Sequence, residues 1–398
     1  MNNCSTPIAD FLNEYALNDT TRLHMPGHKG ALGDCHDGGL VECLKRISAY
    51  DLTEITGADN LYDPSGIIKE SEENAGKIFG AKTFYLTEGS SQAVKAMIYL
   101  AKTRWQNYFG ADVTPYLITL GSSHKALFYA AELLGVNIVE IDIHNLSLNE
   151  IVERIYSSFS EETNPIGVYV TYPDYFGNIV DLKGIKNALK EMDIPLLVDG
   201  AHSAYFKFLD HQKYAEFVHP VDSPADMSCT SAHKTLPTLT GAAYLHINPS
   251  FSDMIPNAIH ALDIFGSSSP SYLTLASLDA FNGMVSEFEK AVWEFCEKVE
   301  TLKREISFMG FNVHKSDPLR IVVWADKRFS GSDFASSLKA KKCEVECFDP
   351  DYVIMMLSPY NTDKDLERIK EAFTSLKSDS FISSNILSSD YNCLDNFK

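Results

Sequence analysis

Between about residues 80 and 250, short apolar runs alternate with longer stretches that have the periodicity of helices. The apolar runs lie at 116–120, 137–141, 166–170, 195–199 and 242–246. Apolar runs this short are typical of strands, and these are apolar enough to be covered on both faces of a sheet. Strands that alternate with helices predict an α/β fold whose sheet is mostly parallel.

The residues after this region predict a second, smaller domain. We expect a long amphipathic helix at 281–309, strands at 311–314, 320–324 and 353–357, and a helix at 363–376. This mixture predicts a small α+β C-terminal domain. The predicted parts are an N-terminal segment (1–65), a large domain (66–290), a small domain (291–377) and a loose tail rich in Ser, Asp and Asn (378–398).

The charge balance excludes several classes of partner. The 398 residues include 34 basic and 54 acidic ones, for a formal net charge of −20, which repels phosphate backbones and anionic lipid. We therefore expect no nucleic-acid and no membrane partner. Because the N-terminus lacks a basic region before an apolar run, and no stretch approaches about 18 uninterrupted apolar residues, we expect a soluble, cytoplasmic protein.

The eight cysteines are scattered, without C-x-x-C spacing or neighbouring histidine pairs. This pattern predicts neither a disulfide framework nor a metal site. Cys343 and Cys347 stand four apart in an alternating stretch, which predicts a strand with both thiols on one face and buried.

Polar side chains follow the apolar runs, at the edge where open parallel sheets bind their ligands. Gly89-Ser90-Ser91 opens a predicted helix at 90–101, and a glycine followed by two hydroxyls at a helix N-terminus predicts an anion site. His124 follows the run at 116–120. Taken singly, these features have ordinary explanations, because Gly-Ser-Ser is a common helix cap and a lone histidine is usually structural.

The run at 195–199 ends on Asp199, with His202 three residues later, and Lys234 follows Ser231 and His233. A strand-end aspartate can be a helix cap or a magnesium ligand, and most lysines are solvated charges. The whole set nevertheless matches what pyridoxal 5'-phosphate (PLP) needs. These needs are an amine for a Schiff base (Lys234), a carboxylate for the pyridine nitrogen (Asp199), a flat side chain to stack on the ring (His124) and an anion pocket (Gly89, Ser90, Ser91, Ser231 and His233). The order of these roles along the chain predicts a PLP enzyme that acts on an amino acid.

The sequence also resembles the Orn/Lys/Arg decarboxylase group of fold-type I PLP enzymes, the prokaryotic basic amino acid decarboxylases. The resemblance runs from about Arg22 to about Ser277 and reappears near Asp363. Its segments are 23–30 (LHMPGHKG), 50–54 (YDLTE), 59–61 (DNL), 64–67 (PSGI), 89–93 (GSSQA), 123–125 (SHK), 172–177 (YPDYFG), 198–202 (VDGAH), 231–234 (SAHK) and 265–272 (FGSSSPSY). The elements at 23–30 and 231–234 are specific to that group.

The resemblance implies a fold-type I PLP-dependent transferase-like large domain with PLP as its cofactor. It assigns Lys234, Asp199 and His124 the roles given above. It implies that Ser90, Ser91, Ser231 and His233 bind the phosphate, and that His202 lies near the carbonyl side of the cofactor. The loop from Ser268 to Tyr272 resembles one that contacts the phosphate of the neighbouring subunit, which implies a homodimer with shared active sites, to which the segment 1–65 contributes.

The chain departs from the family pattern at three places. Gly200 stands where the family usually has a glutamate, and Leu236-Pro237 stands where small residues usually follow the lysine. We also expect a short form of the family, without the N-terminal wing domain of the larger members. These departures affect the expected substrate more than the expected cofactor.

Three functions are therefore compatible with the sequence: α-decarboxylation of arginine, lysine or ornithine, a PLP-dependent aminotransferase or lyase reaction, and PLP binding without catalysis. An aminotransferase generally binds the substrate α-carboxylate with an arginine, and the candidates near the C-terminal end are Arg320, Arg328 and Arg368. Since none stands out as such a clamp, we expect decarboxylation. The candidate partners of a basic substrate side chain are Asp51, Glu54 and Asp59.

Overall fold

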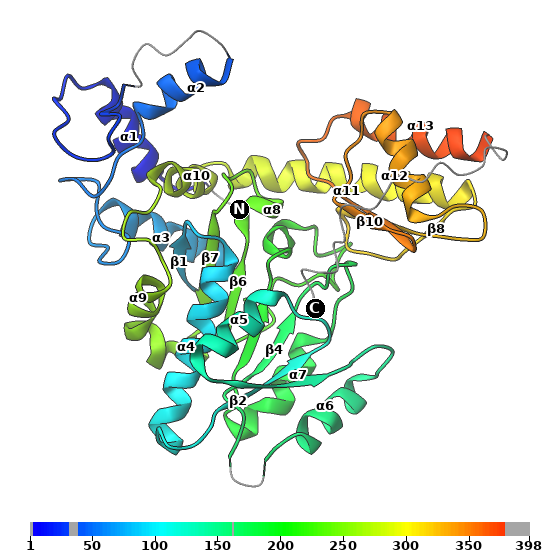
Figure 1. Ribbon diagram of the computed structural model, residues 1–398, viewed down its shortest axis with the longest axis horizontal. Coiled ribbons are helices and arrows are strands. Elements are labelled where there is room, and N and C mark those ends of the chain that lie inside the picture. The colour runs from blue at the N-terminus through cyan, green and yellow to red at the C-terminus, as the bar shows by residue number, and fades with distance from the viewer. Residues whose placement is uncertain (1–2, 32–38, 161–162, 379–398) are drawn as a thin grey trace. The chain divides into compact units, whose positions relative to one another are not determined.

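The computed structural model describes residues 3–31, 39–160 and 163–378, which form two compact units (Figure 1). Unit 1 contains the residues up to 172, 181–207 and 218–286. Unit 2 contains 173–180, 208–217 and the residues from 287 on. The domain limits drawn from the sequence remain a prediction, and from residue 379 on the predicted tail lies outside the described residues.

Unit 1 is built on a seven-stranded sheet with the order β1-β7-β6-β5-β4-β2-β3. Its strands are β1 (Lys82–Leu86), β2 (Tyr116–Leu120), β3 (Asn137–Ile141), β4 (Val168–Thr171), β5 (Leu196–Asp199), β6 (Met227–Thr230) and β7 (Ala243–Ile247). Strand β7 is antiparallel to β1 and β6, whereas β2 to β6 pair in parallel. The predicted mostly parallel sheet is confirmed.

Helices flank this sheet, and Figure 1 shows α4 and α5 crossing it. The helices of unit 1 are α1 (Pro7–Leu17), α2 (Gly39–Ser48), α3 (Ile67–Phe79), α4 (Ser90–Phe109), α5 (Lys125–Leu134), α6 (Leu148–Ser157), α7 (Leu182–Leu189), α8 (Ala232–Thr235), α9 (Ile255–Ile264) and α10 (Tyr272–Asn282). The alanine-rich face of α4 buries Ala93, Val94 and Met97 against core strand residues such as Leu197. The predicted helix at 90–101 is confirmed and continues to Phe109.

The single helix predicted at 281–309 is wrong at its start. Helix α10 ends at Asn282, and a separate helix, α11 (Val285–Phe308), follows. Between them the Gly283 N–H donates to Ala280 O, three residues back, so the last turn of α10 is tighter than an α-helical turn. Glycine also has a lower helix propensity than every residue type except proline. The buried Asn282 amide also donates to Ser71 O at 3.1 Å, which fixes the end of α10.

Unit 2 is a small α+β domain, as predicted. Its four-stranded antiparallel sheet has the order β10-β11-β9-β8. The elements are β8 (Asn312–Val313), β9 (Arg320–Trp324), β10 (Cys347–Asp349) and β11 (Tyr352–Met356), with most of α11, α12 (Gly331–Ala340) and α13 (Asp363–Ser378). The predicted strand from Cys343 to Cys347 is wrong, because β10 begins only at Cys347 and Cys343 follows the turn at Lys342, whose φ is 62°. Cys347 is buried and Cys343 half-buried.

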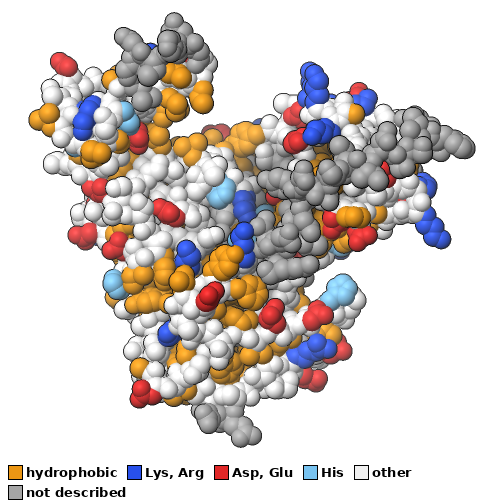
Figure 2. All heavy atoms as spheres, viewed as in Figure 1, with side chains coloured by type: hydrophobic (Ala, Val, Ile, Leu, Met, Phe, Trp, Pro, Cys, Tyr) orange, Lys and Arg blue, Asp and Glu red, His pale blue; other side chains and the backbone are white. Residues whose placement is uncertain are grey.

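Helix α2 exposes a row of large apolar side chains. On α2, Leu40, Leu44 and Ile47 recur at helical spacing and are all exposed, and Figure 2 shows apolar side chains gathered there. Of the helices in the described ranges, none is long and apolar enough to cross a lipid bilayer.

Candidate functional site

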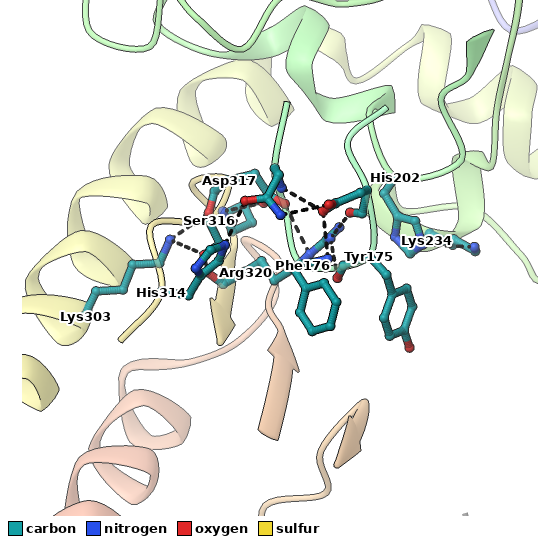
Figure 3. Close-up of polar contacts among 12 residues, drawn as sticks. Tyr175, Phe176, His202, Lys234, Lys303, His314, Ser316, Asp317 and Arg320 are labelled. Carbon is teal, nitrogen blue, oxygen red and sulfur yellow. Dashed lines mark hydrogen bonds and ion pairs between the residues drawn. The ribbon is translucent and has the colours of Figure 1, made fainter. Parts of the chain in front are cut away.

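Lys234 lies on the one-turn helix α8, directly after β6, and its side chain is exposed. Its Nζ is 3.2 Å from Nε2 of His202, which is only 6% exposed (Figure 3). His202 follows β5, the neighbouring strand. The carboxyl ends of β5 and β6 therefore bring together an accessible amine and a buried imidazole, two of the residues predicted for the site.

Asp199, the last residue of β5, is 3% exposed and surrounded by hydrogen-bond donors. Its Oδ2 accepts from the Tyr169 hydroxyl of β4 at 3.0 Å. Its Oδ1 accepts from the Ala201 N–H at 3.1 Å and from the Cys229 thiol of β6 at 3.7 Å. Burial raises the pKa of both Tyr169 and Cys229 well above the usual values, so both remain protonated and act as donors. The buried carboxylate therefore has a donor on each oxygen.

Gly200 occupies a position where a side chain does not fit. A Cβ there would lie 2.9 Å from the Cys229 carbonyl oxygen and closer still to the Ser203 hydroxyl. The Ser203 hydroxyl itself donates to Gly200 O at 2.9 Å. Local packing therefore explains why glycine replaces the glutamate that is usual in the family, because Ser203 and the backbone of β6 occupy the space that a side chain at position 200 would need.

His124 is the N-cap residue of α5, where its Nδ1 accepts the Ala126 N–H at 3.2 Å. An acceptor at Nδ1 puts the proton of the neutral ring on Nε2. Burial lowers the pKa of His124, with a raising contribution from Asp199 and a lowering one from Lys234. His124 is therefore a neutral, flat ring within the electrostatic range of both residues, as a stacking role requires.

The predicted anion loop lies at the N-terminus of α4. Gly89 has a φ of 73°, and its N–H donates to Gly241 O at 2.8 Å. A Cβ at Gly241, with φ of 96°, would meet the Thr87 carbonyl oxygen at 2.5 Å, so only glycine lets the two loops approach. The Ser231 hydroxyl donates to Ser90 Oγ at 2.8 Å. Two hydroxyls thus meet at the N-terminus of a 20-residue helix, a position that favours an anion.

The other three predicted phosphate ligands lie on different elements and make different contacts. Ser91 lies in the first turn of α4. His233 Nδ1 lies 2.9 Å from Ala242 O, and burial lowers the pKa of this imidazole. Ser268 is exposed on the loop between α9 and α10, and within the described ranges no hydrogen bond joins it to the other site residues. Its contact with a neighbouring subunit remains a prediction.

These residues fit PLP. The exposed amine, the buried carboxylate, the neutral imidazole and the hydroxyl pair at a helix N-terminus all follow strands of the same sheet. They are the four kinds of group that PLP requires. In the part of the chain that the structure describes, no three His, Cys, Asp or Glu side chains gather as a metal centre would need.

The three candidate arginines lie in unit 2, and each has a carboxylate partner there. Arg320 is 3% exposed; its Nε pairs with Asp317 Oδ2 at 3.1 Å, and Nη1 donates to Asp174 O at 2.6 Å and Tyr175 O at 2.7 Å (Figure 3). Arg328 pairs with Asp326, and Arg368 with Asp365. The Arg320 guanidinium is thus engaged within its own unit.

The three acidic residues that are candidate partners of a basic substrate side chain differ in the contacts they make. Both Asp59 oxygens accept backbone N–H groups, including those of Gly66 and Ile68 at the start of α3. Burial opposes ionisation, but these bonds lower the pKa of Asp59, which is therefore a helix-capping carboxylate. Asp51 lies 3.1 Å from His28 Nε2. Glu54 has no comparable partner among the described residues.

Sequence reasoning missed Tyr169 and Cys229, the two side chains that contact Asp199. Tyr169 lay inside a predicted strand, and Cys229 was counted only as a scattered thiol. Their role depends on strand order and register, because Asp199 pairs with Thr171 of β4 and Cys229 of β6. No local pattern in the sequence contains that information.

A family model described as Orn/Lys/Arg decarboxylase, major domain, matches residues 6–108 and 123–357. The uncharacterized protein YaaO of Bacillus subtilis is 28% identical over 369 residues, which cover 89% of this chain and 74% of that protein. The arginine decarboxylase of Bacillus subtilis is 26% identical over 402 residues, which cover 94% and 78%.

Among solved structures, the lysine decarboxylase LdcF of Francisella novicida superimposes with a TM-score of 0.76 at 19% sequence identity. The match covers 94% of this chain and 60% of that one, so the chain spans about three-fifths of the length of this decarboxylase. At this identity the likeness shows the fold, which is that of fold-type I PLP enzymes.

Proposed function

The chain belongs to the Orn/Lys/Arg decarboxylase family, and we propose that it is a PLP-dependent enzyme that decarboxylates arginine, lysine or ornithine to the corresponding amine. The observation that carries the proposal is the exposed Lys234 amine beside His202, at the sheet edge that also holds Asp199. Arginine decarboxylases among the relatives support this choice of substrate class.

Bound PLP withdraws electrons from the Cα of an attached amino acid and so weakens the bonds there. In our proposal, Lys234 supplies the amine that attaches the cofactor, and Asp199 keeps a proton on the pyridine nitrogen. The hydroxyls of Ser90 and Ser231 bind the phosphate. When carbon dioxide leaves, Cα takes up one proton from solvent overall, and His202, 3.2 Å from Lys234 Nζ, is positioned to hold it.

We favour decarboxylation over transamination because the three candidate arginines already pair with carboxylates of the chain. A bound cofactor would weaken the bonds at Cα, and a decarboxylase holds the substrate carboxylate in a site that does not stabilise its charge. An arginine clamp would do the opposite. Arg320, the most buried candidate, already contacts Asp317 and two backbone carbonyls. PLP binding without catalysis loses its main support, because local packing explains Gly200.

We further propose a cytoplasmic homodimer with shared active sites. The exposed Ser268 loop and the exposed apolar stripe of α2 (Leu40, Leu44 and Ile47) suit a contact with a second copy. Mixing Lys234→Ala with an inactive variant of the 265–271 loop should restore activity, because a hybrid dimer would contain one site made of intact parts. Verified hybrids that stay inactive would favour self-contained subunits.

The reaction is tested by supplying arginine, lysine and ornithine separately to PLP-loaded protein and identifying products by mass spectrometry. Acidic and apolar amino acids serve as controls, and Lys234→Ala shows the background. We expect one of the three basic amino acids to give its amine with carbon dioxide. If none does while another amino acid yields a keto acid or an elimination product, the decarboxylase proposal fails.

A further inference from the structure

We propose that Tyr169 is a positioning residue that aims Oδ2 of Asp199 at the pyridine nitrogen of PLP, with Cys229 holding the other oxygen. The inference rests on the proposed function, because it requires PLP to bind with its ring nitrogen at Asp199. It concerns two residues of the chain, one on β4 and one on β6, which flank the strand that carries the carboxylate.

An ionised carboxylate has four lone-pair sites for hydrogen-bond donors. Oδ1 of Asp199 receives two donors, the Ala201 N–H at 3.1 Å and the Cys229 thiol at 3.7 Å. Oδ2 receives one, the Tyr169 hydroxyl at 3.0 Å. One lone-pair site is left, and it belongs to Oδ2. A pyridine N–H that approaches this carboxylate therefore shares Oδ2 with Tyr169.

The sheet places the Tyr169 hydroxyl against Asp199. Thr171 pairs with Asp199 across β4 and β5, and Tyr169 lies two residues earlier, on the same face of β4. The Tyr169 side chain is fully buried, and its hydroxyl makes one hydrogen bond, to Asp199 Oδ2. The hydrogen bond from Tyr169 to Asp199 is shorter than the one from Cys229, at 3.0 Å against 3.7 Å, and a hydroxyl is a stronger donor than a thiol. Tyr169 therefore has the larger influence on how the carboxylate is oriented.

Loss of the Tyr169 hydroxyl should change where the cofactor proton resides. Without it, Oδ2 becomes more basic and competes more strongly for the proton that it shares with the pyridine nitrogen, and the carboxylate is free to rotate away from its aim. Both changes reduce the share of this proton that resides on the nitrogen. Loss of the Cys229 thiol should have the same effect in weaker form, because that contact is longer and is made to Oδ1.

The test binds PLP labelled with ¹⁵N in the ring to the 398-residue protein and measures the ¹⁵N chemical shift of the bound cofactor at fixed neutral pH. We expect Tyr169→Phe to move this signal toward that of neutral pyridine, Cys229→Ala to move it less, and Cys229→Ser to leave it near the wild-type position. Tyr244→Phe is the matched control, because Tyr244 is a fully buried tyrosine of the same sheet without contact to Asp199. Asp199→Asn fixes the position of the signal when the carboxylate is lost.

A signal that moves with Asp199→Asn but not with Tyr169→Phe would overturn the inference and leave the proposed function standing. Failure of wild-type protein to bind labelled PLP would instead remove the proposed function and this inference with it. If Tyr169→Phe does not fold, 3-fluorotyrosine at position 169 decides the question, since it keeps the shape and makes the phenol a stronger donor. It should move the signal away from that of neutral pyridine, and an unchanged signal would refute the role.

Discussion

Lys234 and Lys303 each lie near a buried aspartate, but the two regions differ in what surrounds the amine. Lys234 in unit 1 is exposed and lies beside the His202 imidazole. Lys303 in unit 2 donates to Asp317 O at 2.7 Å and Ser316 Oγ at 3.2 Å, and burial lowers its pKa to about 8 (Figure 3). A lowered lysine pKa is often taken as a mark of function. Lys303, however, is buried, and its ammonium donates to two oxygens of its own unit.

The comparison shows that the two regions differ in the access of solvent to the lysine amine. Around Lys303 the charges satisfy one another, because Asp317 pairs with Arg320 and the Arg320 guanidinium holds the backbone carbonyls of Asp174 and Tyr175. Around Lys234 the amine is exposed, and the His202 imidazole lies 3.2 Å from it. We therefore expect the first region to control stability and the second to control chemistry.

The largest expected effect comes from exchanging the two lysines for neutral residues. Lys234→Ala should reduce amine production to background, since it removes the amine that is proposed to attach the cofactor. Lys303→Met should keep most of the activity per folded molecule. Both are measured as product formed per mole of soluble protein. Loss of activity in a folded Lys303→Met protein, with activity retained in Lys234→Ala, would reverse the comparison.

The second prediction concerns the ion pair beside Lys303. Asp317→Asn should lower the free energy of unfolding of unit 2 by about 3–5 kcal/mol, because it leaves the 3%-exposed Arg320 as a buried unpaired charge. Asp326→Asn, which breaks the exposed pair with Arg328, is the control and should cost less than about 1 kcal/mol. Urea unfolding followed by circular dichroism measures both. Equal costs would mean that burial of the pair contributes nothing.

Asp199→Asn should lower turnover by roughly 100- to 1000-fold, the usual loss when one charge-stabilising group is removed from a reaction centre. PLP binding should fall much less, since the contacts around Ser90 and Ser231 are unchanged. Single-turnover rates and titration with PLP separate the two effects. Weak cofactor binding with normal turnover per bound cofactor would contradict the role given to Asp199.

The smallest prediction extends the comparison to a buried carboxylate remote in sequence from both lysines. Burial raises the pKa of Glu72 from 4.5 to about 7, so the stability that its protonated form contributes is present below about pH 4.5 and is lost as the pH rises to 7. Glu72→Gln should therefore flatten the decline of unfolding free energy between pH 5 and 8 by up to about 3 kcal/mol. The exposed Glu73 on the same helix supplies the control, Glu73→Gln, and an identical slope in all three proteins would refute the assignment.

Much of the fold could be predicted from the sequence, because strand and helix periodicities are local properties. The strands at 116–120, 137–141 and 320–324 were predicted to the residue. The break at Gly283 was not, since the stretch on both sides of it is continuously helical in pattern and the break depends on the packing of Asn282 against Ser71. The apparent strand at 343–347 failed because a left-handed turn at Lys342 delays β10.

The sequence was sufficient to name candidate site residues at the end of each strand, but not their partners on neighbouring strands. The residues after β2, β5 and β6 could be named because the ends of parallel strands gather at one edge of the sheet. Partners across strands could not be named, and this is why Tyr169 was missed. The state of Arg320 also depends on a long-range contact, with a loop about 145 residues earlier in the chain.

The most direct test of the account is the identity of the lysine that attaches PLP. Wild-type protein is loaded with PLP, reduced with borohydride, digested and examined by peptide mass spectrometry. The account predicts one dominant modified peptide, which contains Lys234, and the same modification in Lys303→Met. A dominant adduct on Lys303 or on any lysine other than Lys234, or no adduct after loading, would contradict it.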